Sequence, residues 1–196
     1  MNNDNSQIKF KAIYGLLLSC AADIVESLKH VPILADHLKG APKTIKQNAG
    51  IVFEIAVYLT ARLDVAMVQF EQDHGVRKDL FLFITDGLNE SFSQYLDNTN
   101  LLEVIDNRMG SYGKCFREGG KDVFKQLHSI LLDNIKHAMN TTKLEVWKDG
   151  IVPIVLGDVF SGIHATIAMI EIEKNIVGKF ACSLKHVLQD LSLIHI

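Results

Sequence analysis

Residues 51–70, IVFEIAVYLTARLDVAMVQF, form an almost continuous apolar run that contains three charged residues, Glu54, Arg62 and Asp64. At 100° per residue, a helix over this run points Arg62 and Asp64 in roughly opposite directions. No single solvent-facing edge can therefore take both charges and leave the apolar residues buried. Such a helix is typical of the centre of a bundle, where its charges need partners or a ligand.

The composition of the 196-residue chain indicates one all-α domain. Hydrophobic residues make up 48% and charged residues 22%, which is typical of a globular protein with a core that needs no disulfide or metal. The chain has only three prolines, and helix-forming residues are plentiful. We therefore expect a single bundle of about six long helices that spans residues 1–196, with residues 1–7 frayed.

Spacings of three and four between apolar residues predict where these helices lie. The central helix is expected over about residues 44–73, and Asn98 or Asn100 can cap the helix that starts at residue 101. The other helices predicted from this spacing cover residues 8–30, 76–97, 101–118 and 121–140. Pro32 breaks the chain after the first helix, and Gly119 and Gly120 end the helix over residues 101–118.

The last quarter of the chain allows two interpretations. Residues 143–155 contain two β-friendly runs around Asp149 and Gly150, which is a hairpin signal. Pro153 weakens the second strand, so we favour a loop followed by a helix to about Asn175 and a final helix to Leu191. Residues 192–196, SLIHI, have no capping or polar tail, and we expect them to be a non-native or truncated end.

Charge and cysteine usage limit the partners and the compartment. The 20 basic and 23 acidic residues are evenly mixed, which argues against nucleic acid or an anionic membrane surface as a partner. The apolar runs are too short to span a membrane. The three cysteines are far apart, as in a reducing compartment, so we expect a cytoplasmic protein. A lipoprotein anchored at Cys20 is a minor alternative, because two lysines and an apolar segment precede that residue.

One constellation of side chains could carry binding chemistry. Arg108 and Tyr112 are four residues apart and share a helix face, and two nearby glycines would allow another helix to approach closely. We expect Arg108 to reach Asp64 of the central helix, with Arg62 and Glu54 extending the set. These five residues could hold a small anion through the guanidinium fork and the phenol. The same set could instead be a buried network that fixes helix register, and that interpretation is favoured.

No motif for metal, cofactor or nucleophile chemistry is present. Asp133 and His137 are four residues apart, but the repeated Glu-x-x-His pairs of a di-metal bundle are absent. The chain also lacks the phosphate-binding and serine-nucleophile motifs. We therefore expect no metal and no cofactor.

The sequence leads to two functional hypotheses. The first is a non-catalytic protein that binds an unidentified protein partner or itself through a helical surface. The second is a pocket for a small anionic or polar ligand, in an enzyme or a binding protein, built on Asp64, Arg108 and Tyr112 with Arg62 and Glu54. The first is favoured.

Overall fold

The structure is a computed structural model that describes residues 3–28, 45–69, 73–96, 100–140 and 178. This part of the chain contains five α-helices and one 3₁₀ turn and no strand, which confirms the all-α fold class. The helices are α1 (Asn3–Leu28), α3 (Ile45–Gln69), α4 (His74–Phe92), α5 (Leu101–Glu118) and α6 (Val123–Asn140), and the 3₁₀ turn η1 (Gly120–Asp122) joins the last two. The hairpin alternative and the two helices expected after residue 141 lie outside the described residues.

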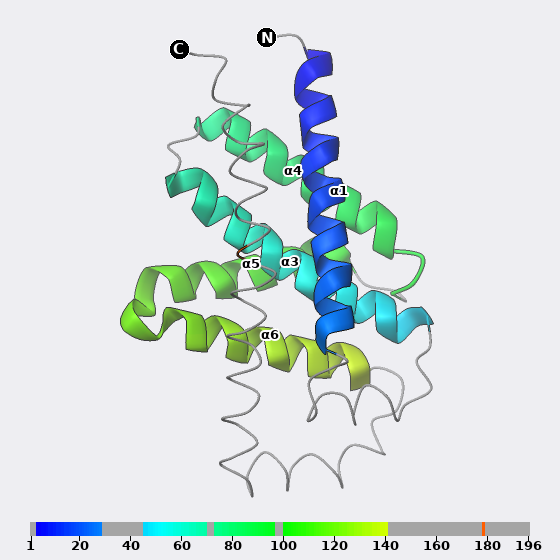
Figure 1. The fold of residues 1–196 in the computed structure, drawn as a ribbon, viewed down its shortest axis with the longest axis vertical. Helices are drawn as coiled ribbons and strands as arrows, with labels where there is room; N and C mark the ends of the chain where they lie inside the picture. Colours follow the sequence, from blue (N-terminus) through cyan, green and yellow to red (C-terminus); the bar gives the residue numbers. More distant parts are fainter. Residues whose placement is uncertain (1–2, 29–44, 70–72, 97–99, 141–177, 179–196) are drawn as a thin grey trace, which may run out of the picture.

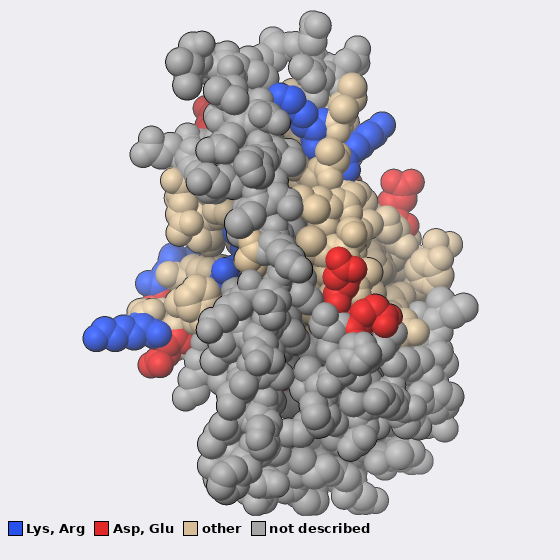
Figure 2. Space-filling view, viewed as in Figure 1, with Lys and Arg blue, Asp and Glu red and all other residues tan. Residues whose placement is uncertain are grey.

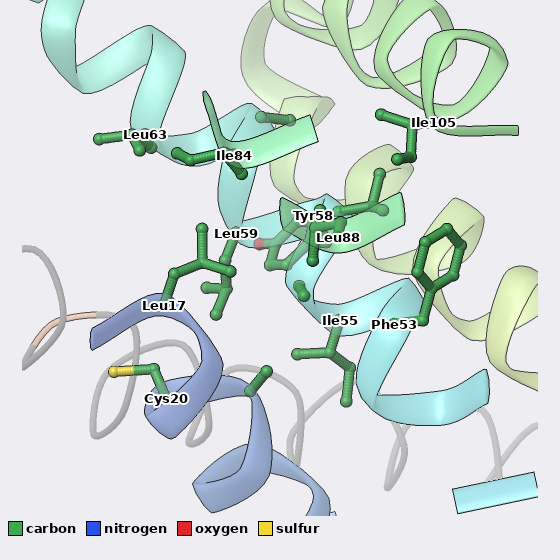
Figure 3. Close-up of a cluster of buried hydrophobic side chains, with 14 of the residues drawn as sticks. Leu17, Cys20, Phe53, Ile55, Tyr58, Leu59, Leu63, Ile84, Leu88 and Ile105 are labelled. Atoms are coloured by element: carbon green, nitrogen blue, oxygen red, sulfur yellow. The ribbon is translucent and has the colours of Figure 1, made fainter. Parts of the chain in front are cut away.

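The long apolar run is the centre of the bundle, as predicted. Helix α3 packs against α1, α4, α5 and α6 (Figure 1). Every residue from Phe53 to Ala61 is buried, so this helix is enclosed on all sides over more than two turns. Figure 3 shows Ile55, Tyr58 and Leu59 of α3 among apolar side chains of the surrounding helices. Burial against four helices explains why the run has no polar face.

The five helices form two antiparallel pairs, α3 with α4 and α5 with α6, and α1 crosses the first of them. In Figure 1, α4 runs back along α3, and α6 runs back along α5. Helix α1 lies in front of α3 and α4 and contacts both. At its contact with α4, the Tyr14 hydroxyl and the Ser91 hydroxyl are 2.9 Å apart and hydrogen-bonded. A Cβ at Gly87 would lie 3.0 Å from the Tyr14 ring, so the glycine allows this close packing.

Several predicted helix boundaries differ from the structure. Helix α1 begins at Asn3, five residues before the predicted start, and α4 ends at Phe92, five residues before the predicted end. The central helix was expected to reach Asp73, but α3 ends at Gln69, and Asp73 is the N-cap of α4. Its carboxylate accepts hydrogen bonds from the backbone N–H groups of Gly75 and Val76 at 2.8 and 3.2 Å. The dipeptide His74-Gly75 therefore begins a helix instead of ending one, because an aspartate cap satisfies the first free N–H groups.

The two ends of α5 agree with the prediction. Asn100 is its N-cap and accepts a hydrogen bond from the backbone N–H of Glu103 at 3.4 Å. Gly119 ends it, and Gly120 has a positive φ of 51°. A Cβ at Gly119 would lie 2.5 Å from the Cys115 carbonyl oxygen and 2.8 Å from the Cα of Val123. This turn therefore requires a residue without a side chain, and it directs α6 back along α5.

No helix in the described ranges is both long enough and apolar enough to cross a bilayer.

Candidate functional site

An ion pair with a buried carboxylate joins the central helix to α5. The Nε atom of Arg108 donates to one carboxylate oxygen of Glu54 at 3.2 Å, and an Nη atom donates to the other at 3.3 Å. Glu54 is only 4% exposed, whereas the side chain of Arg108 is 26% exposed. The fork-shaped contact uses the planar geometry of both groups. A carboxylate that deep in the core needs such a partner, because an unpaired buried charge is strongly destabilising.

Tyr112 extends this contact to α6. Its side chain is completely buried, and its hydroxyl oxygen accepts a hydrogen bond from Nδ2 of Asn134 at 3.2 Å. Its ring packs edge-on against Tyr58 of α3, with 5.6 Å between the ring centroids. Burial raises the pKa of the Tyr112 phenol well above its usual range, the Asn134 hydrogen bond opposes this shift, and the Glu54 carboxylate adds to it. The phenol is therefore neutral at physiological pH.

These five residues, Glu54, Tyr58, Arg108, Tyr112 and Asn134, are called the polar cluster below. Three of them were among the predicted site residues. Tyr58 and Asn134 were missed, although Asn134 lies on the helix face that also carries Leu127 and Leu131, both buried. A polar residue on an otherwise apolar face was the available signal, because buried amides need partners. The cluster connects α3, α5 and α6 at one level of the bundle.

The expected contact between Asp64 and Arg108 is wrong. Asp64 accepts a hydrogen bond from an Nη atom of Arg77 in the first turn of α4 at 2.8 Å. Ten residues separate Asp64 from Glu54, so Asp64 lies about 15 Å further along α3. Glu54, not Asp64, is at the level where the middle of α5 crosses the central helix. The side chain of Asp64 is 43% exposed, so this second pair lies near the surface.

Arg62 also lies outside the polar cluster. Its guanidinium carbon is 4.9 Å from the centre of the Phe124 ring, at the start of α6. This is a cation–π geometry, and Phe124 itself is exposed. The prediction that α3 cannot turn all its charges to one side is correct. Each charge meets a different neighbouring helix: Glu54 meets α5, Arg62 meets α6 and Asp64 meets α4.

A small pocket lies beside the pair formed by Asp64 and Arg77. Thr60, Met67 and Phe81 are among its lining residues, and it has room for about one water molecule. The Nε atom of Arg77 is buried there and has no acceptor in the described part of the chain. A pocket of this size is too small for a metabolite, so the Asp64 region is a poor ligand site.

The described residues offer little support for a metal site or a reactive cysteine. They contain no group of three histidine, cysteine or carboxylate side chains arranged for a metal ion. Asp133 is exposed, and the side chain of His137 lies outside what the structure describes. Cys20 and Cys115 are free and buried. Burial and the nearby Asp23 carboxylate raise the pKa of the Cys20 thiol, which makes it a poor nucleophile.

The residue that the lipoprotein alternative uses as its attachment point, Cys20, is part of the first helix. Cys20 lies within α1, which continues without a break from Asn3 to Leu28. Its side chain belongs to the main hydrophobic core together with Leu17 and Ile24. In this fold the thiol is therefore a core group.

Hydrogen bonds join the polar side chains of the cluster in two pairs, Arg108 with Glu54 and Asn134 with Tyr112. The two charges of Glu54 and Arg108 neutralise each other, and the hydroxyl of Tyr112 is bound by Asn134. Such a network fixes how three helices are positioned along one another, because each bond forms at only one register. No protein-family model, no curated protein and no solved structure matches this chain.

Proposed function

We propose that this chain is a non-catalytic interaction protein that works through the outer surface of its bundle, by binding another protein or itself. The observation that supports this proposal is the fork-shaped contact between Arg108 and Glu54. Arg108 is one of the cations of the proposed pocket, and the edge of its guanidinium formed by Nε and one Nη atom is directed at a carboxylate of the same chain. Such an arginine is better suited to fixing the fold than to binding a ligand.

The alternative is a pocket for a small anionic or polar ligand. This pocket requires Asp64, Arg108 and Tyr112 to contact the ligand together, with Arg62 and Glu54 as further contacts. The pairs formed by these residues lie at different levels of α3, and Tyr112 is inaccessible to solvent. A ligand at this edge of Arg108 would have to displace the buried Glu54 carboxylate, which would then lose two charge-assisted hydrogen bonds. This cost makes the pocket the weaker proposal.

The cytoplasm is the compartment that best fits this role. Three widely spaced cysteines, of which Cys20 and Cys115 are free and buried, are typical of a reducing compartment. The even mixture of acidic and basic residues favours a protein partner over nucleic acid.

A ligand screen by thermal unfolding tests this proposal against its alternative. The full chain would be melted with phosphate, sulfate, citrate and other small carboxylates, alongside Arg108→Met and a control, Arg117→Met. Arg117 is an exposed arginine on the same helix, so the control removes the same charge without touching the polar cluster. If Arg108 has only a structural role, no anion should raise the melting temperature of the wild type by more than it raises that of Arg108→Met.

The opposite result would support the pocket. An anion that stabilises the wild type and Arg117→Met, but not Arg108→Met, would show that Arg108 binds it. At a hundredfold excess over the dissociation constant, such a ligand would stabilise the fold by about 2.7 kcal/mol, which a thermal melt detects easily.

A further inference from the structure

We draw no further inference here: the strongest candidate, the uncharged stripe of small exposed residues on α1 that lies between the basic and acidic side chains visible in Figure 2, carries none because nothing in the structure shows what covers it.

Discussion

Arg108 of α5 holds the buried carboxylate of Glu54 with two hydrogen bonds, of 3.2 and 3.3 Å, across 54 residues of sequence. The pair is unequal, because Glu54 is enclosed and Arg108 retains contact with water through about a quarter of its side chain. Removing Arg108 should therefore cost more free energy of unfolding than removing Glu54, because the carboxylate is enclosed and the guanidinium can still contact water.

The hydrogen bond between Tyr112 and Asn134 should contribute measurably to stability. Tyr112→Phe keeps the ring packing against Tyr58 and removes only the hydroxyl, which leaves the buried amide of Asn134 without its acceptor. We expect a loss of about 1–2 kcal/mol in the free energy of unfolding, measured by urea denaturation. Tyr95→Phe is the control, because Tyr95 is exposed and should change little. Equal effects of the two substitutions would contradict a role for the Asn134 contact.

Asp64→Asn should have a much smaller effect than disruption of the Glu54 pair. The side chains of Asp64 and Arg77 are 43% and 24% exposed, so water screens their attraction. We expect a loss below about 1 kcal/mol at low salt, and a still smaller loss in about 0.5 M salt. Urea denaturation at both salt concentrations measures this. A loss as large as that of a buried pair would mean that Asp64 is more enclosed than the structure indicates.

Two glycines should respond to alanine in opposite directions. Gly15 is an exposed helical residue with open space around it, so Gly15→Ala should stabilise the fold by about 0.5–1 kcal/mol. Gly119→Ala would place a Cβ within 2.5 Å of the Cys115 carbonyl oxygen and should destabilise by about 1–3 kcal/mol. Thermal melts at low protein concentration compare the two. A stabilising Gly119→Ala would show that the turn between α5 and α6 relaxes easily.

Stability should fall at alkaline pH, partly through Tyr112. Because burial raises the pKa of Tyr112 in the folded chain above the 10.0 of a free tyrosine, the folded state keeps the proton to a higher pH than the unfolded state. The stability that this pKa shift contributes is complete below pH 10.0. It is lost as the pH rises above that value, at up to about 1.4 kcal/mol per pH unit. Tyr112→Phe should show a shallower decline in unfolding experiments between pH 9 and 11, even though Tyr14 and Cys20 titrate in both proteins. Identical slopes would contradict a buried Tyr112 phenol.

The helices could be predicted from the sequence because periodicity acts over short distances. Apolar spacing placed α1, α3, α4, α5 and α6 to within a few residues at most ends, and the charges of α3 indicated its central position. Asp73 was misassigned because an aspartate between two helices can end one or cap the next. Only its hydrogen bonds to the N–H groups of Gly75 and Val76 decide between these roles.

The partners within the site could not be predicted in the same way. Periodicity gives the face on which a side chain lies, but not the level at which two helices cross. Arg108 could have met Asp64 or Glu54, which lie about 15 Å apart along α3, and packing of α5 on the central helix selects Glu54. Tyr112 was predicted to act together with Arg108, whose helix face it shares, but its hydroxyl is bound by Asn134 from a third helix.

A double-mutant cycle on Glu54 and Arg108 tests the central claim most directly, namely that this pair belongs to the fold and not to a ligand site. The free energies of unfolding of Arg108→Met, Glu54→Leu and the double variant would be measured by urea denaturation. Arg108→Met removes two hydrogen bonds and the opposite charge from a buried carboxylate and should lose about 3 kcal/mol. Glu54→Leu should lose less, and the double variant should recover most of the loss. If Arg108→Met leaves the stability unchanged or raises it, the arginine is kept for binding and this account is wrong.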